Sequence, residues 1–132
     1  MRPGAPRGDR TSEPVPGAEI PAVQVHWEAF IDDLLNRTAK FPKALRVVFT
    51  QRIEATALDV LDRLIEARFN RDRASALRAA NFALERLRVL LRIAWRRRYL
   101  DHAGLEHLAR GIDEAGRMIG GWLRATAPAA SQ

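Results

Sequence analysis

Residues 51–69 read QRIEATALDVLDRLIEARF and carry two apolar stripes at helical spacing. Residues three and four apart share a helix face, so each stripe marks one side of a helix. The first stripe begins upstream and comprises Leu45, Phe49, Ile53, Ala57, Val60 and Leu64. The second stripe comprises Val47, Leu58, Leu61, Ile65 and Phe69. The spacing therefore predicts a long helix with one face in the core of the domain. Its second apolar face must be buried against another part of the chain or another subunit.

Turn-forming residues on both sides of this helix divide the rest of the chain. Pro42 precedes the helix and disfavours helical geometry at Phe41, while the sequence NRDRAS, residues 70–75, interrupts the pattern after it. Asp72 or Ser75 is a suitable N-cap for the next helix, and Asp101 for the last. The predicted helices span about residues 23–38, 43–69, 74–98 and 102–124. With no strand-like alternation, this pattern predicts an all-α, antiparallel up-and-down four-helix bundle.

Composition sets the domain boundaries and excludes several classes of protein. Residues 1–21 hold five of the seven prolines and are predicted to be a disordered arm, residues 22–125 the bundle domain, and residues 126–132 a disordered tail. The chain has no cysteine and no apolar run long enough to span a membrane. We expect a cytoplasmic protein without disulfides, metal or cofactor.

The net charge of +6 comes from one segment. Residues 72–98 contain eight arginines against two acidic residues, whereas the remainder of the chain is close to neutral. A basic field confined to one helix suggests a polyanionic partner, most often RNA or DNA.

Within this segment the arginines recur at helical spacing. Arg88, Arg92 and Arg96 are four residues apart and form a ladder that can follow a phosphate backbone. The predicted nucleic-acid-binding residues are Arg78, Arg86, Arg88, Arg92, Arg96, Arg97 and Arg98. The alternative is a solvated face paired with acidic residues of neighbouring helices. Trp95 and Tyr99 could stack on unpaired bases, although Trp95 also suits a core or an interface.

Two further groups of residues predict packing contacts. No helix of a four-helix bundle is central, so the second stripe, through Leu58, Leu61, Ile65 and Phe69, predicts a homo-oligomer. Packing of this stripe under the N-terminal arm is the alternative. In the last helix, Gly116 and Gly120 are four residues apart and precede Trp122, which continues the apolar face. They predict a close helix contact, within or between subunits.

Signals for catalysis are weak. Arg97 and His102 match the Arg-x(4-6)-His spacing of helical ribonucleases, but Arg96 also fits, and such a match is common in an arginine-rich chain. His26 and His107 have no partner at metal-ligand spacing and are interpreted as surface or interface residues. We predict no catalytic residues and no metal ligands.

Three segments resemble the Avd-like (bAvd) accessory proteins of diversity-generating retroelements. They are KFPKALR at residues 40–46, QRIEATALDVLDRLIEAR at residues 51–68 and EAGRMIGGWLRA at residues 114–125. The resemblance implies a barrel-shaped homopentamer without catalytic activity. It also implies binding to the element's reverse transcriptase and RNA template, in support of mutagenic cDNA synthesis. The four-helix proteins encoded in rRNA intervening sequences are related, and a nucleic-acid-binding oligomer of that type, without a polymerase partner, is the alternative.

Overall fold

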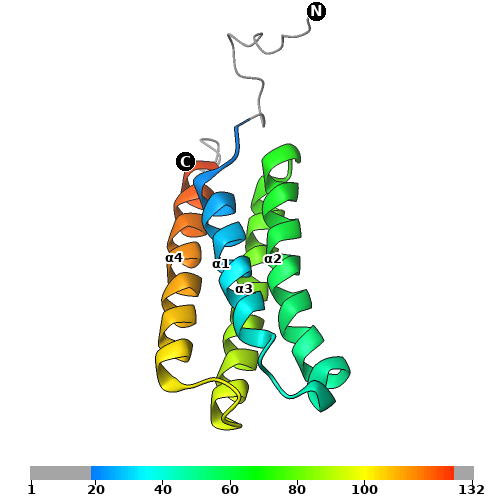
Figure 1. The fold of residues 1–132 in the computed structure, drawn as a ribbon. Coiled ribbons are helices and arrows are strands. Elements are labelled where there is room, and N and C mark those ends of the chain that lie inside the picture. Colours follow the sequence, from blue (N-terminus) through cyan, green and yellow to red (C-terminus); the bar gives the residue numbers. More distant parts are fainter. Residues whose placement is uncertain (1–18, 127–132) are drawn as a thin grey trace, which may run out of the picture.

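The computed structural model describes residues 19–126, in which every regular element is helical. Four long helices run up and down in an antiparallel bundle (Figure 1). They are α1 (Ala22–Thr38), α2 (Gln51–Phe69), α3 (Arg73–Arg96) and α4 (His102–Thr126). Each helix packs on two others, α1 and α3 both lying between α2 and α4. The predicted all-α four-helix architecture is confirmed.

The helix ends agree with the predicted caps. The Asp72 carboxylate accepts a hydrogen bond from the Ser75 backbone N–H at 3.2 Å, so Asp72 rather than Ser75 is the N-cap of α3. The Asp101 carboxylate accepts from the Gly104 N–H at 2.7 Å before α4. Thr126, predicted to begin the tail, is the last residue of α4. Most of the predicted arm and tail lies outside the described residues.

The start of the second helix is irregular, whereas the sequence predicted a continuous helix from residue 43. A 3-10 turn, η3 (Lys43–Leu45), leads into a π-helical turn, η4 (Arg46–Thr50), and only then into α2. Glu54 anchors this connection, accepting hydrogen bonds from Thr38 Oγ1 at 2.7 Å and from both terminal nitrogens of Arg46. These contacts between α1, η4 and α2 are made across the connection, so the local pattern could not reveal them.

A chain of contacts across three helices fixes the middle of the bundle. The Trp27 ring of α1 is fully buried, and its Nε1–H donates to the Ala57 carbonyl of α2 at 2.8 Å. Phe30 stacks on Trp27 with ring centroids 4.1 Å apart and an interplanar angle of 9°. A Cβ added to Gly111 of α4 would lie 2.7 Å from Phe30 Cδ2. Phe30 cannot retreat without disturbing Trp27, so this position requires glycine.

The two glycines predicted to make a close contact do not make one inside the chain. A Cβ on Gly116 would meet only Leu84 Cδ1, at 3.9 Å, and one on Gly120 only the Arg124 side chain, at 3.5 Å. These are ordinary van der Waals distances. The contact within the subunit was therefore predicted at the wrong glycines, and a contact between subunits stays a prediction.

No helix within residues 19–126 is both long enough and apolar enough to cross a membrane.

We predict opposite effects for alanine at two glycines of α4. Gly111→Ala forces a methyl group against Phe30 and should lower the free energy of unfolding by about 1–3 kcal/mol. Gly116→Ala should raise it by up to about 1 kcal/mol, because alanine is the better helix former. Urea denaturation measures both. Equal effects of the two substitutions would contradict the assignment of Gly111, and loss of self-association in Gly116→Ala would support the contact between subunits.

Candidate nucleic-acid interface

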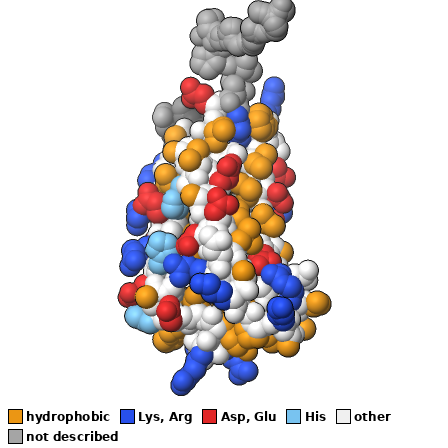
Figure 2. Space-filling model, viewed as in Figure 1, with side chains coloured by type: hydrophobic (Ala, Val, Ile, Leu, Met, Phe, Trp, Pro, Cys, Tyr) orange, Lys and Arg blue, Asp and Glu red, His pale blue; other side chains and the backbone are white. Residues whose placement is uncertain are grey.

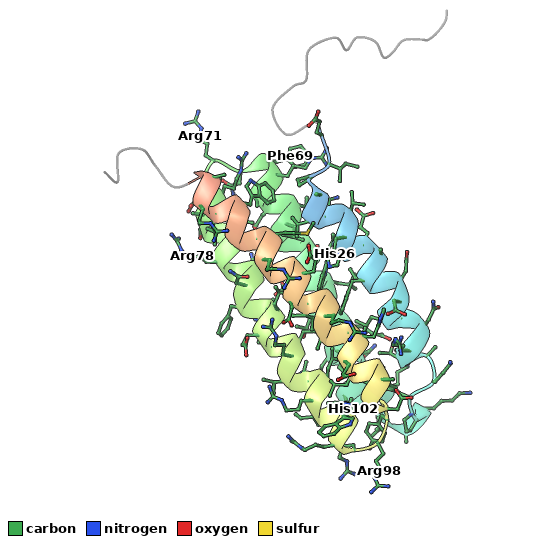
Figure 3. All side chains as sticks on the ribbon, turned by 90° about the vertical axis from the view of Figure 1, so that its left-hand side faces the viewer. His26, Phe69, Arg71, Arg78, Arg98 and His102 are labelled. Atoms are coloured by element: carbon green, nitrogen blue, oxygen red, sulfur yellow. The ribbon has the colours of Figure 1, made fainter. Side chains whose placement is uncertain are left out.

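Four arginines at and just after the C-terminal end of α3 gather at the end of the bundle where α3 connects to α4. Arg92, Arg96, Arg97 and Arg98 are all exposed. Among residues 19–126 none of the four has an ion-pair partner, so their guanidinium groups are available to an external anion. Figure 3 shows Arg98 projecting from this end, beyond the start of α4 at His102.

The connection between α1 and α2 reaches the same end (Figure 1). The Tyr99 ring lies 5.9 Å from the Phe41 ring and 6.3 Å from the Phe49 ring, measured between centroids. This aromatic contact joins the two connections, and it brings the exposed Lys40 and Lys43 to the end that carries the arginines. We call the surface made by Lys40, Lys43, Arg92, Arg96, Arg97 and Arg98 the basic end. Basic side chains are visible at the bottom of the molecule in Figure 2.

Arg98 holds a backbone conformation that normally favours glycine. Its φ is 68°, in the left-handed region, and it is the only such non-glycine residue among those described. The Arg98 N–H bonds to the Trp95 carbonyl and the Tyr99 N–H to the Ala94 carbonyl, both at 2.9 Å. This is the Schellman pattern that ends a helix, with arginine where glycine is usual. A left-handed residue other than glycine costs about 1–2 kcal/mol, so the side chain is kept at this turn against a conformational penalty.

The remaining predicted arginines do not join this cluster. Arg88 contacts Glu85 at 2.9 Å and Asp113 of α4 at 2.6 Å, and Arg86 contacts Asp59 of α2 at 3.0 Å. Partial burial lowers the pKa of Arg88, but the hydrogen bonds to Asp113 and Glu85 outweigh it and hold that pKa above its ordinary value. The predicted ladder is therefore split. Its first member, Arg88, pairs with acidic residues, as the alternative interpretation of a solvated, paired face expects.

Arg78 is exposed near the opposite end of the bundle, close to Arg71 in Figure 3. At a rise of 1.5 Å per residue, Arg78 lies roughly 27 Å along α3 from Arg96. The predicted arginine face is therefore divided into two separate regions, and the basic end contains more exposed arginines than the region around Arg78.

The predicted oligomer residues lie on the outside of α2. Leu58, Ile65 and Phe69 are 47%, 39% and 65% exposed, whereas Leu61 is half-buried against the core. Figure 2 shows apolar side chains running along the α2 side of the molecule, beside α1. Trp122 is half-buried, with the Arg73 guanidinium 5.6 Å from its ring centroid. A row of exposed large apolar residues on a small domain marks a contact surface.

The histidines form no catalytic or metal-binding arrangement in the described part of the chain. His26 bonds to the Gly111 carbonyl at 2.8 Å, and His107 contacts Asp33 at 3.0 Å. His102 contacts Glu106 at 3.3 Å and the Trp95 ring, and no recorded contact between residues 19 and 126 joins it to Arg96 or Arg97. No group of three or more candidate ligands for a metal ion occurs among these residues.

Fold and surface together define a small helical bundle with a basic end and an exposed apolar flank. A family model described as bAvd-like matches residues 22–126, and the chain belongs to this family. At the level of the family it is an Avd-like accessory protein. A search of the curated proteins gave no match.

We predict that Arg98→Gly stabilises the fold. Glycine removes the left-handed penalty, and after its own entropic cost the free energy of unfolding should rise by about 1 kcal/mol. Arg97→Gly is the matched control, because Arg97 has an ordinary φ of −83° and its replacement should give no gain. Thermal and urea denaturation measure both variants. A loss of stability in Arg98→Gly would show that the arginine side chain itself supports the turn.

Proposed function

We propose that the protein is the non-catalytic accessory factor of a diversity-generating retroelement, acting in the cytoplasm. In this role it binds RNA or DNA through the basic end, and it docks the element's reverse transcriptase during mutagenic cDNA synthesis. Membership of the bAvd-like family supports this role over that of an rRNA intervening-sequence protein. The observation that carries the binding site is the set of exposed, unpaired Arg92, Arg96, Arg97 and Arg98 beside Lys40 and Lys43.

Binding at this site is expected to be strong at low salt and independent of sequence. Each guanidinium or ammonium group that contacts a phosphate releases condensed counterions, so affinity falls steeply as salt rises. Contacts to phosphate position the protein but do not read bases. An accessory factor that must follow a template along its length needs this kind of binding.

Two matched double variants test the site. Arg97→Gln with Arg98→Gln removes two charges from the basic end, and Arg71→Gln with Arg78→Gln removes two from the opposite end. The first pair should weaken RNA binding at least tenfold at low salt and reduce the slope of log affinity against log salt by about one per lost contact. The second pair should change both much less. Equal losses would refute the assignment to one end.

The polymerase partner is tested by co-expression with the reverse transcriptase of the same element. We expect the two proteins to co-purify after nuclease treatment. A reverse transcriptase that elutes entirely free of this protein would contradict the accessory role.

We further propose that the subunits close into a homopentameric ring. A ring needs two different patches that fit one another, whereas a two-fold dimer uses one patch twice. The outer face of α2 supplies one apolar patch through Leu58, Ile65 and Phe69. Phe82 and Val89, seven residues apart on α3 and 66% and 41% exposed, supply another. The number five comes from the family resemblance.

Complementary variants test the ring. Leu58→Glu with Ile65→Glu, and separately Phe82→Glu with Val89→Glu, should each sediment as a monomer of 14.9 kDa, because a buried unpaired carboxylate is costly. Mixed together, they should form a one-to-one dimer, since each retains the patch that the other lacks. Ala103→Glu, an exposed site on α4, is the control and should keep the wild-type mass. No dimer in the mixture would exclude a head-to-tail interface between these patches.

A further inference from the structure

A groove between α3 and α4 leads to the basic end. Apolar side chains line it, and two guanidinium groups border it: the lining residues are Arg88, Leu91, Arg92, Leu105, Ala109 and Ile112. Arg88 is held by Asp113 and Glu85, so only Arg92 is free to meet an anion there. An apolar floor beside a free cation suits a ligand that is flat and apolar at one part and anionic at another.

Trp95 follows Arg92 of this groove by about one helical turn, and it is the most exposed of the three tryptophans. Its side chain is 39% exposed, whereas Trp27 is fully buried and Trp122 is half-buried. The Trp95 ring lies 6.2 Å from the His102 ring at an interplanar angle of 54°, so the two rings form an open corner at the start of α4. Tyr99 is unsuited to the same role, because it packs between Phe41 and Phe49.

Cations flank the exposed indole. Arg92 precedes Trp95 by one turn and Arg96 follows it directly, and both are exposed and unpaired among the described residues. Nearby acidic residues already have partners: Glu106 contacts His102, Asp113 contacts Arg88, and the Asp101 carboxylate accepts a hydrogen bond from the Gly104 N–H. The surroundings therefore favour a polyanion over an acidic or neutral apolar partner such as a second copy of this face.

We propose that Trp95 stacks on an unpaired base of single-stranded nucleic acid, whose phosphates bind Arg92 and Arg96 and whose next base enters the α3–α4 groove. The inference rests on the proposed function and narrows its ligand. In a duplex both faces of every internal base are covered, so a stacking platform gains nothing from it, whereas an unpaired base offers a free face. A duplex is still expected to bind to the basic end through its phosphates, but stacking on Trp95 should add nothing to its affinity.

The test compares a 20-nucleotide oligo(U) with a 20-base-pair RNA duplex, both bound to the full chain at the same low salt. Trp95→Ala should lose tenfold or more in affinity for oligo(U) and less than twofold for the duplex. Trp95→Phe, which keeps a ring, should recover most of the affinity. Intrinsic fluorescence should be strongly quenched by oligo(U) in the wild type and only weakly in Trp95→Phe, because Trp27 is fully buried and Trp122 lies beside Arg73, at the start of α3. Arg92→Gln with Arg96→Gln should weaken the binding of both oligo(U) and the duplex.

Three results overturn the inference. One is an equal loss for single strand and duplex in Trp95→Ala, another is unchanged quenching in Trp95→Phe, and the third is a fall in sedimentation mass, which places Trp95 in a subunit contact. In each case the basic end keeps its role if Arg97→Gln with Arg98→Gln still weakens binding. The proposed function fails separately, if no substitution of these arginines alters binding to either ligand. Should Trp95→Ala fail to fold, Trp95→Phe and its fluorescence decide the question.

Discussion

The bundle depends on the contact line that runs from Gly111 through Phe30 and Trp27 to the Ala57 carbonyl. It joins α4, α1 and α2 at the same height in the bundle: Gly111 packs on Phe30, Phe30 stacks on Trp27, and Trp27 donates to the Ala57 carbonyl. The Trp27 indole satisfies its only polar group inside the core, so the largest fully buried side chain of the domain has no unpaired donor. The last turn of α1 places Thr38 beside Glu54, and the hydrogen bond between them holds the start of the connection to α2.

This arrangement separates the interior of the domain from its outer surfaces. The core uses one stripe of each helix, so the second stripe of α2 and the Phe82 and Val89 pair of α3 stay outside. Acidic residues of α2 and α4 form ion pairs with the arginines in the middle of α3. The arginines at the C-terminal end of α3 have no ion-pair partner among the described residues. The described part of the domain thus exposes two kinds of surface, apolar along its flank and cationic at its end. Arg98 combines a left-handed backbone conformation with a charged side chain at this end.

The sequence predicted what local patterns determine. Helical period and capping residues sufficed for the four helices and for the caps Asp72 and Asp101. It failed where the answer depends on which residues of two helices lie side by side. The arginine ladder was overestimated because Asp59 and Asp113 belong to other helices. The critical glycine was missed because Gly111 matters only through Phe30, eighty-one residues earlier in the chain. The irregular turns before α2 were missed as well, and Glu54 there bonds to Thr38 and Arg46 across the connection.

Hydrogen–deuterium exchange of the protein with and without bound RNA tests the central claim most directly, because it reports on every segment at once. The account predicts slower exchange on binding in the α1–α2 connection, residues 39–50, and around the α3–α4 connection, residues 92–104. The turn between α2 and α3, residues 69–75, should exchange at the same rate with and without RNA. Protection confined to that turn, or spread evenly over all four helices, would contradict the assignment of nucleic-acid binding to the basic end.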